Sequence, residues 1–261
     1  MVDKKFNIEI FDIKLDTQFI GRNFYYYDEL DSTNSFLMDK KFGAKENGCV
    51  VLAEFQTSGR GRLERTWESQ KNLNLTFSIL FTELEMIENS LSILNLATSL
   101  VVAQSIENLF QLKTDLKWPN DILIKEKKVA GILLESSSSG SKLNKLIIGI
   151  GLNVNQSKFL GEYKIPPTSI RIESRSIIER ERVLAEILNN HEAMIYKLVD
   201  NPSSMLNDWK NKCSMLGEKI CIEQNGKLIY GVFEDIDEEG YLLLRTKKKI
   251  EKINFGDVSV I

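Results

Sequence analysis

Histidine is nearly absent from this chain of 261 residues, in which His191 is the only one. Zinc sites built on several histidines are therefore excluded, and a Ser-His-Asp relay would depend on one residue inside a predicted surface helix. We interpret His191 as a solvated helix residue.

Cysteine is also scarce. Cys49, Cys213 and Cys221 are odd in number, widely spaced and form no C-x-x-C pair. This usage favours reduced thiols in a cytoplasmic protein, where cysteine serves as a small apolar residue. Met1–Lys5 leads into alternating polar and apolar residues rather than an apolar signal region, and no run is long enough to span a membrane, so we expect no membrane partner.

A large excess of charge of either sign is missing as well. Lys and Arg total 34 and Asp and Glu total 37, which gives a net charge of −3 with histidine neutral. Such a chain has no overall attraction for DNA, so any phosphate binding must come from local clusters. Apolar residues make up 43% of the chain, which at this length supplies a core for one large domain and a small one.

The most distinctive basic cluster is Gly59–Trp67 (Gly-Arg-Gly-Arg-Leu-Glu-Arg-Thr-Trp), called the arginine loop below. It separates two expected buried strands, Cys49–Phe55 and Leu73–Phe81. Its glycines let backbone N–H groups approach a ligand, and its arginines suit phosphate or carboxylate oxygens. A flexible loop with solvated charges is the alternative. Trp67 favours a nucleotide ligand, because an aromatic ring beside guanidinium groups suits a base. The spacing matches neither the phosphate loop nor the dinucleotide fingerprint.

A polar cluster follows the strand expected at Asn23–Asp28. The run Asp31-Ser32-Thr33-Asn34 is typical of a helix start, and we expect the helix to end at about Phe42, before Gly43. Capping explains these side chains, but short polar groups at a strand-to-helix junction could also bind a ligand. Gln56 lies at the mouth of the arginine loop.

A further cluster is Lys117-Trp118-Pro119-Asn120-Asp121. Pro119 cannot donate to a strand ladder, so the polar residues around it form either a hairpin turn or part of a site. After a turn at Glu126–Lys128, the chain returns in a strand at Val129–Glu135. Gly131 in that strand leaves space for a ligand or another backbone.

Other segments are expected to support the sheet. Glu88–Phe110 predicts a long, largely buried helix behind it. Ser136–Ser141 is interpreted as a flexible, exposed linker that leads into a strand at Leu146–Asn155. Asn153, near the end of that strand, is either a turn former or a residue that reads the edge of a base.

The C-terminal third changes character along its length. Ser176-Ile177-Ile178-Glu179 matches a capping box that opens a helix to about Val199, and a shorter helix is expected at Ser203–Leu216. From Glu218, short strands with turn signals predict a small barrel-like domain. Its basic segment Arg245–Lys252 is typical of a solvated strand edge, with docking to an acidic partner as the alternative.

Together and in this order, the motifs resemble the biotin protein ligase family from about Asn23 to the C-terminal end. The resemblance implies an α+β fold, with a central mixed β-sheet flanked by helices as in class II aminoacyl-tRNA synthetases. This catalytic biotin- and ATP-binding domain would span residues 1–216, and a small SH3-like β-barrel would span residues 217–261. The implied reaction joins biotin to ATP, with Mg²⁺, as biotinyl-5′-AMP. Biotin then passes to one lysine of a biotin carboxyl carrier protein, such as that of acetyl-CoA carboxylase.

The resemblance also implies roles for particular residues. Those expected to bind biotin or ATP are Ser32, Thr33, Asn34, Gln56, Gly59, Arg60, Gly61, Arg62, Arg65, Trp67, Lys128, Gly131 and Asn153. Those expected to act in catalysis are Arg62, Lys117, Asp121 and Lys128. A carboxylate that attacks a phosphate meets like-charge repulsion, so cations must neutralise both anions.

Within that set, the polar residues from Ser32 to Gln56 would bind the ureido group of biotin, and Lys128 would hold its carboxylate. Arg62, Arg65 and Lys117 would face the phosphates, and Trp67 and Asn153 would face the adenine. Asp121 would either hold magnesium or accept the proton of the incoming carrier lysine, and the arginine loop would close over the adenylate to exclude water.

The chain departs from the family pattern in two places. Leu63-Glu64 stands where the family often has a small or basic pair, so we expect the charge and mobility of the loop to differ. Only about twenty residues precede the first family-like strand, too few for the winged helix-turn-helix of many bacterial members. We therefore expect a ligase without repressor activity. Alternatives are a lipoate or octanoate ligase of related fold and a non-catalytic biotin sensor; a homodimer is compatible with the resemblance.

Overall fold

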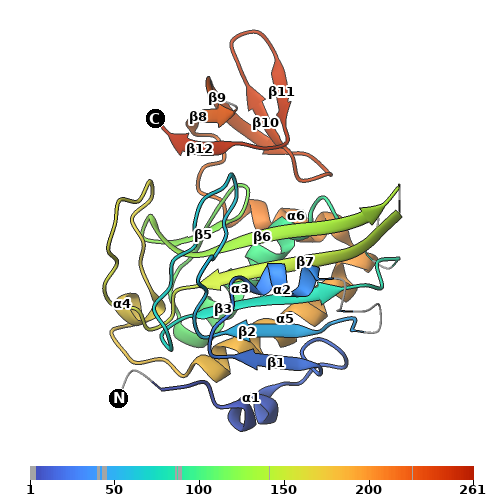
Figure 1. The fold of residues 1–261 in the computed structure, drawn as a ribbon. Helices are drawn as coiled ribbons and strands as arrows, with labels where there is room; N and C mark the ends of the chain where they lie inside the picture. Colours follow the sequence, from blue (N-terminus) through green and yellow to red (C-terminus); the bar gives the residue numbers. More distant parts are fainter. Residues whose placement is uncertain are drawn as a thin grey trace.

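The computed structural model describes residues 4–39, 42, 46–85, 87, 90–140, 142–224 and 226–261, and the chain forms two parts (Figure 1). The larger part is a seven-stranded mixed sheet with helices on both faces, and the smaller, C-terminal part is a five-stranded antiparallel sheet. This arrangement confirms the α+β class, the central mixed sheet and the separate all-β unit that the sequence predicts.

The large sheet has the strand order β1-β2-β3-β7-β6-β5-β4. Its strands are β1 (Phe24–Tyr27), β2 (Val50–Ala53), β3 (Leu75–Phe81), β4 (Asp115–Lys117), β5 (Asp121–Ile124), β6 (Lys127–Ser139) and β7 (Lys142–Leu152). β1 and β2 are parallel, and every other neighbouring pair is antiparallel. The strands expected around β1, β2 and β3 are present, each slightly shorter than predicted.

β6 and β7 form a long hairpin where a flexible linker was expected at Ser136–Ser141. Ser136 pairs with Leu146 and Ser139 pairs with Lys142, so the serines extend β6 to its end. Ser141 lies outside the described residues. The serine-rich composition indicated a linker, but the backbone of serine pairs in a ladder as readily as that of other residues, and the partner strand decides its conformation.

The two faces of the sheet carry different layers, as Figure 1 shows. One face packs in the main core against α3 (Leu94–Phe110), α5 (Arg180–Asp200) and α6 (Pro202–Lys210). The other, called the α2 face below, carries α2 (Thr33–Met38) over a small apolar cluster. Two short helices, α1 (Ile8–Lys14) and α4 (Ile170–Ser174), complete the larger part. Among the described helices, none has the length and apolarity needed to cross a membrane.

Several helix boundaries differ from the sequence-based expectation. α2 ends at Met38 rather than near Phe42, and the expected stop at Gly43 lies outside the described residues. α3 is buried as predicted but begins at Leu94; the expected start at Glu88 is again outside the described residues. α6 ends at Lys210, and turns rather than helix lead from it to Leu216.

The interpretation of His191 as solvated is wrong. Its ring is fully buried in α5, 5.9 Å from the Phe81 ring between centroids, and its Nε2 lies 3.3 Å from Thr98 Oγ1. Burial lowers the pKa of the imidazole to about 3, which keeps it neutral. α5 packs against α1, α3 and α6. These helices cover more of its surface than its many polar residues indicate.

The capping box expected at Ser176-Ile177-Ile178-Glu179 is also wrong. Glu179 occupies the N-cap of α5 without a side-chain cap hydrogen bond. The Ile178 N–H instead donates to Asn155 Oδ1 at 2.9 Å, so a contact with a distant segment sets the conformation before the helix.

A buried ion pair fastens α5 to the sheet. Arg180 donates to both oxygens of Glu54, at 2.5 and 2.9 Å, and only 4% of the arginine and 2% of the glutamate is exposed. Glu54 also accepts the Phe6 N–H and the Tyr26 hydroxyl, each at 2.8 Å. Four donors thus satisfy a carboxylate that lies two residues before Gln56.

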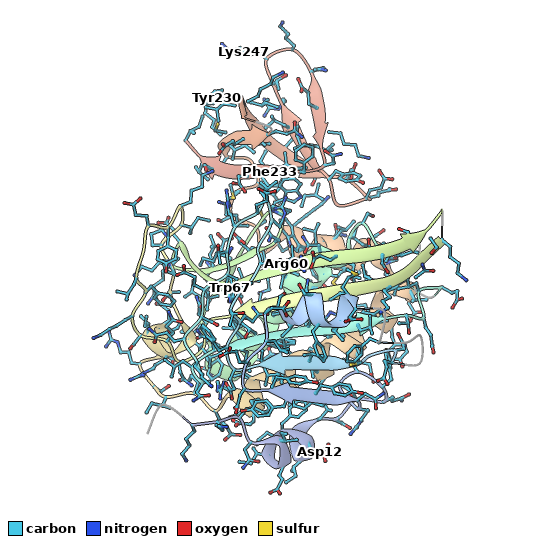
Figure 2. All side chains as sticks on the ribbon, viewed as in Figure 1. Asp12, Arg60, Trp67, Tyr230, Phe233 and Lys247 are labelled. Carbon is cyan, nitrogen blue, oxygen red and sulfur yellow. The ribbon has the colours of Figure 1, made fainter. Side chains whose placement is uncertain are left out.

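The C-terminal sheet has the strand order β11-β10-β9-β8-β12. Its strands are β8 (Lys219–Gln224), β9 (Lys227–Ile236), β10 (Leu242–Arg245), β11 (Ile250–Ile253) and β12 (Asp257–Val260). Within the described strands the order is linear, so the sheet is not closed into the ring of a barrel. Figure 2 shows Lys247, in the basic segment, at the tip of the β10–β11 hairpin on the side away from the large sheet.

The two parts are joined by specific polar contacts. The Trp118 Nε1–H donates to the Gly240 carbonyl at 3.1 Å, and Lys210 pairs with Asp235 at 2.7 Å. Gly240 has φ +79°, and a β-carbon there would lie 3.1 Å from Leu96 Cδ1. A turn of the small sheet therefore rests closely on the beginning of α3.

We predict that Glu54→Ala lowers the free energy of unfolding by about 3–5 kcal/mol, because it leaves the Arg180 charge buried and unpaired. Urea denaturation followed by circular dichroism measures this loss. As a control, Asp208→Ala removes the exposed pair with Lys197 and should cost about 1 kcal/mol or less. Equal losses for the two variants would contradict the role given to the buried pair.

Candidate active site

The candidate site lies on the α2 face at the end of β7, where two glycines leave the strand without side chains. The isoleucines of β7 at 148 and 150 point into the main core, whereas Gly149 and Gly151 alternate with them on the opposite face. A β-carbon at Gly149 would overlap the Asn34 amide, and one at Gly151 would overlap the Trp67 ring. The two glycines therefore make room for two predicted site residues.

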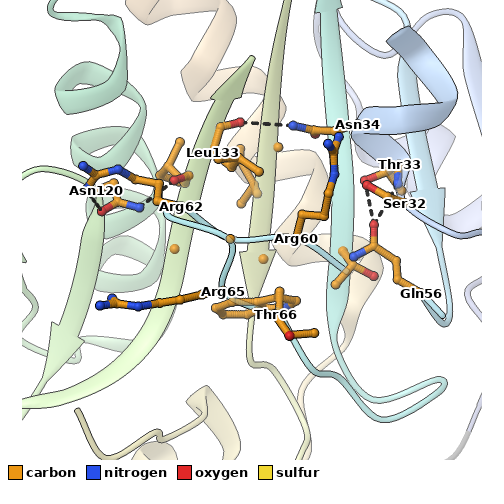
Figure 3. A pocket seen from close by; sticks show the side chains of 18 of the residues that line it. Ser32, Thr33, Asn34, Gln56, Arg60, Arg62, Arg65, Thr66, Asn120 and Leu133 are labelled. Atoms are coloured by element: carbon orange, nitrogen blue, oxygen red, sulfur yellow. Dashed lines mark hydrogen bonds between the residues drawn. The ribbon is translucent and has the colours of Figure 1, made fainter. Parts of the chain in front are cut away.

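A cavity of about 120 Å³, called the first cavity, opens on this face (Figure 3). The predicted residues in its wall are Ser32, Thr33, Asn34, Gln56, Arg60, Gly61, Arg62, Arg65, Trp67, Asp121, Lys128 and Gly131. Of the predicted residues, Gly59, Lys117 and Asn153 lie outside this wall. Folding thus brings together motifs that are separated by up to about a hundred residues in the chain.

The polar end of the first cavity is a connected set of hydrogen bonds. The Thr33 N–H and hydroxyl both donate to Gln56 Oε1, at 2.8 and 3.1 Å. Ser78 Oγ lies 2.6 Å from Thr33 Oγ1 and 2.5 Å from Asn34 Oδ1. Ser32 caps α2 by accepting the Ser35 N–H, so its capping and cavity-lining roles coexist. All of these groups except Gln56 and Ser35 are buried, which holds the polar atoms in fixed directions.

The arginine loop is folded as a small hairpin of its own. The Gly61 N–H donates to the Arg65 carbonyl at 2.7 Å, and the Trp67 N–H donates to the Gly59 carbonyl at 3.0 Å. A β-carbon at Gly59 would overlap the Trp67 carbonyl, so this glycine is needed where the loop crosses itself. Both glycines therefore take part in the loop's own backbone contacts.

The turn of this hairpin is formed by the unusual pair Leu63-Glu64. Both residues lie in the left-handed region, with φ of 53° and 59°. This conformation is costly for side chains other than glycine, asparagine and aspartate. The departure from the family pattern therefore falls on the tip of the loop, while the arginines occupy its sides.

Each arginine of the loop reaches a different element. Arg60 donates to Glu135 Oε2 of β6 at 2.7 Å, and Arg62 donates to Asn120 Oδ1 before β5 at 3.1 Å. Arg65 pairs with Asp257 of β12. Figure 3 shows Arg62 directed to Asn120 and Arg60 directed towards Asn34. Burial lowers the pKa of the Arg62 guanidinium, although nearby carboxylates oppose this shift.

Lys128 and Asp121 form an ion pair across β5 and β6. Lys128 Nζ lies 2.6 Å from Asp121 Oδ1 and 5.7 Å from the centroid of the Trp67 ring. Gly131 makes room for this lysine, because a β-carbon there would lie 3.2 Å from Nζ. Lys117 is paired with Asp121 across the β4–β5 turn. Burial lowers the pKa of Lys117, an effect that the charges of Asp121 and Asp257 oppose.

A second cavity, of about 510 Å³, adjoins the first. The two share Arg65, Thr66, Trp67, Asp121 and Lys128 in their walls. Asn153 lines the second cavity, and its Nδ2 donates to the Thr168 carbonyl at 3.0 Å. Asn153 Oδ1 and Trp67 Nε1 are buried without a hydrogen-bond partner. One acceptor and one donor are therefore available to a ligand.

Sequence reasoning did not assign Ser78, Glu135, Lys164 or Asp257 to the site. Thr76 and Ser78, the two polar residues of β3, were a usable signal, since their spacing of two places them on one face of the strand. Asp257 had no signal, because its place beside Arg65 depends on how the two parts of the chain dock. Lys164 also pairs with Asp257, at 3.2 Å. Although burial opposes the shift, hydrogen bonds from Arg65 and Lys164 lower the pKa of the Asp257 carboxyl.

Comparison with known proteins places this geometry in a family. Residues 26–153 match the biotin/lipoate A/B protein ligase family, and residues 215–260 match the biotin protein ligase C terminal domain. The bifunctional ligase/repressor BirA of Bacillus subtilis is 33% identical over 94% of this chain and 76% of its own length. The biotin–acetyl-CoA-carboxylase ligase of Mycobacterium tuberculosis is 30% identical over 87% of this chain and 85% of its own.

A solved structure gives the same result for the fold. The biotin protein ligase of Aquifex aeolicus in complex with biotin and ATP superposes with a TM-score of 0.80 and 32% identity, over 92% of this chain and 99% of that one. At 92% of this chain, the match extends over more than the large part alone. With a core that matches the ligase family and a C-terminal unit that matches the biotin-specific domain, the chain belongs to the biotin/lipoate A/B protein ligase family, in its biotin protein ligase branch.

Proposed function

We propose that this chain activates biotin with ATP to give biotinyl-5′-AMP and pyrophosphate, and then transfers biotin to a lysine of a biotin carboxyl carrier domain, such as that of acetyl-CoA carboxylase. The observation that carries this proposal is the pair of adjoining cavities that share Trp67, Asp121 and Lys128. A reaction between two small molecules requires their reacting groups to be held side by side, and the shared wall provides that meeting point. The biotin- and ATP-bound relative supports the choice of ligands.

The first cavity suits biotin. Its wall presents hydroxyl and amide groups of Thr33, Asn34 and Gln56, which would bind the ureido group, and Ser78 holds two of them from behind. A buried urea left unpaired would cost on the order of 1–3 kcal/mol per group, so this polar end is what biotin requires. A lipoyl or fatty chain would place apolar carbons against the same groups. The cavity therefore favours biotin over the lipoate and octanoate alternative.

The second cavity suits the nucleotide. The Trp67 ring faces both cavities, and an aromatic surface of this kind stacks on a base. Asn153 Oδ1 would accept a hydrogen bond from the adenine amino group, which removes the cost of leaving that oxygen unpaired. Arg65, which is shared by the two walls, would face the phosphates.

Two cations, Arg65 and Lys128, lie in the wall that the two cavities share, and Arg62 lines the first cavity. Lys128 would hold the biotin carboxylate beside the α-phosphate, and Arg62 and Lys117 would neutralise the charge that builds as the carboxylate oxygen attacks phosphorus and pyrophosphate leaves. Asp121, already beside Lys128, would accept the proton of the carrier lysine as its amine attacks the acyl carbon and AMP leaves. That lysine has an ordinary pKa of about 10.4, so a nearby base is needed at neutral pH.

Magnesium fits this site only together with the nucleotide. Among the residues that the structure describes, no group of three or more metal-ligating side chains exists, and Asp121 is a single carboxylate. Mg²⁺ commonly binds proteins through one or two carboxylates plus substrate phosphates, so Asp121 with the phosphates of ATP would suffice. When bound, the ion would reduce the negative charge of the triphosphate.

The remaining parts of the proposal concern organisation and location. Residues 1–216 would form the catalytic domain and residues 217–261 a domain that completes the site through Asp257. A cytoplasmic location is supported by the three free thiols. Cys49 and Cys213 are buried, and burial raises the pKa of each to about 12.

We predict that Lys128→Ala lowers the rate of biotinyl-adenylate formation by at least about 100-fold, because the charge that holds the biotin carboxylate is lost. Radiolabelled biotin, ATP and Mg²⁺, with thin-layer separation of the adenylate, measure this rate. Lys142→Ala, an exposed lysine of β7, is the matched control and should react as the parent does. Normal turnover by the Lys128 variant would refute the assigned role. A parent enzyme that activates lipoate but not biotin would refute the proposed function.

We predict that Asp121→Asn slows transfer of biotin to the carrier by about 100-fold and changes the Kd for biotin by less than about threefold. Asparagine keeps the size and one acceptor oxygen beside Lys128 but cannot take a proton. Isothermal calorimetry gives the Kd, and a chase of preformed adenylate with the carrier domain gives the transfer rate. Unchanged transfer in the chase would show that another group accepts the proton.

We predict that Lys117→Arg extends activity to higher pH. Burial lowers the pKa of Lys117, so this lysine loses its proton, and with it the phosphate-facing charge, at a lower pH than an ordinary lysine. Arginine remains charged throughout the accessible range. The alkaline limb of the profile of kcat/KM for ATP should therefore move upwards in the variant. An unmoved limb would mean that another group sets it.

A further inference from the structure

Glu135 is not part of the wall of the first cavity, but it contacts two residues that are. It lies on β6 on the same side of the strand as Gly131 and Leu133, and its side chain is 25% exposed. Its Oε2 accepts hydrogen bonds from two residues of the cavity wall, Asn34 Nδ2 at 2.8 Å and Arg60 at 2.7 Å. A single carboxylate oxygen therefore joins the polar end of the cavity to the arginine loop.

This contact determines the direction of the Asn34 amide. An ionised carboxylate can only accept hydrogen bonds, so the amide must turn its Nδ2 towards Glu135. The same nitrogen lies 3.3 Å from the Leu133 carbonyl, and Oδ1 is left facing Ser78 Oγ at 2.5 Å. Asn34 is only 3% exposed, so water does not compete for these bonds. An amide held this way presents an acceptor, which is what a ureido N–H requires.

The second contact holds the base of the arginine loop. Arg60 forms a backbone bridge with Thr66, on the opposite side of the loop's hairpin. Fixing the Arg60 side chain on β6 therefore fixes both sides of the loop over the cavity. Arg65 and Arg62 add contacts to Asp257 and Asn120, but neither of those partners touches a residue of the polar end.

We propose that Glu135 is a positioning residue that couples recognition of the substrate's ureido group to closure of the arginine loop. The inference rests on the proposed biotin ligase function and adds a residue to it. Glu135 orients Asn34 as an acceptor and, through the same oxygen, holds Arg60 so that the loop shields the adenylate. Loss of the carboxylate should therefore have two effects: weaker binding of biotin and access of water to the biotinyl-adenylate.

The test compares Glu135→Ala and Glu135→Gln with the parent enzyme. We expect KM for biotin to rise about tenfold in the alanine variant, because the misplaced Asn34 amide faces biotin. The glutamine variant keeps the shape and one acceptor oxygen, so it should retain the fold and show a smaller rise. Glu126→Gln removes one exposed carboxylate from the β5–β6 turn and should match the parent.

Closure of the arginine loop can be measured separately, from the hydrolysis of the adenylate. Water that reaches the adenylate releases AMP without transfer, so we expect AMP formed per biotin transferred to rise at least about threefold in both Glu135 variants. Trypsin cleavage after the arginines of the loop, at saturating biotin, should accelerate in parallel. A purely structural role would lower the midpoint of thermal unfolding without changing the ratio of AMP to product.

A double-mutant cycle with Arg60→Ala completes the test. If Glu135 controls leakage through Arg60, the double variant should leak no more than Arg60→Ala alone. Parent-like KM for biotin and a parent-like AMP ratio in Glu135→Ala would overturn the inference, while leaving the ligase function standing. A parent enzyme that forms no adenylate from biotin would instead overturn the function itself.

Discussion

The site depends on the end of β7, which carries isoleucines on one face and glycines on the other. β7 places isoleucine in the main core and glycine on the α2 face, so the same alternation that stabilises the sheet also creates the volume for Asn34 and Trp67. A side chain at either glycine would displace one of these two groups. The core and the cavity are therefore built by the same residues and cannot be changed independently.

Charge in the site is balanced before any substrate arrives. Arg60 faces Glu135, Arg65 faces Asp257 and Lys128 faces Asp121, so each of these cations already has a carboxylate partner. Unpaired cations in a partly buried cluster would repel one another, and the carboxylates reduce that cost. An incoming anion then replaces or joins a carboxylate instead of entering an unbalanced field. This balance agrees with a chain whose net charge is only −3.

Local patterns in the sequence predicted the early strands, and the resemblance of its motifs to the ligase family implied the fold class and most of the residues in the wall of the first cavity. A run typical of a buried strand indicated β3, and the arginine loop and the Lys-Trp-Pro-Asn-Asp run were distinctive enough to be recognised. Errors arose where a distant partner decided the outcome. Serines that indicated a linker pair with β7, and His191 is buried against Phe81 of β3 and Thr98 of α3. Asp257 joins the site only because the small sheet docks where it does, a property of the whole fold that no single segment encodes.

The contact between Trp118 and Gly240 has a consequence for how distant changes act on the site. Trp118 lies within the motif that carries Lys117 and Asp121, and its indole holds the turn before β10 by a backbone carbonyl. Any bulkier residue at 240 would press on Leu96 and Ile93 of the α3 region and tilt the small sheet. Because that sheet also carries Asp257, the tilt would withdraw a carboxylate from Arg65. The small sheet has no residue in the polar end of the first cavity. A change in its orientation would therefore alter the contacts of Arg65, on the phosphate side, and leave the groups that face biotin in place.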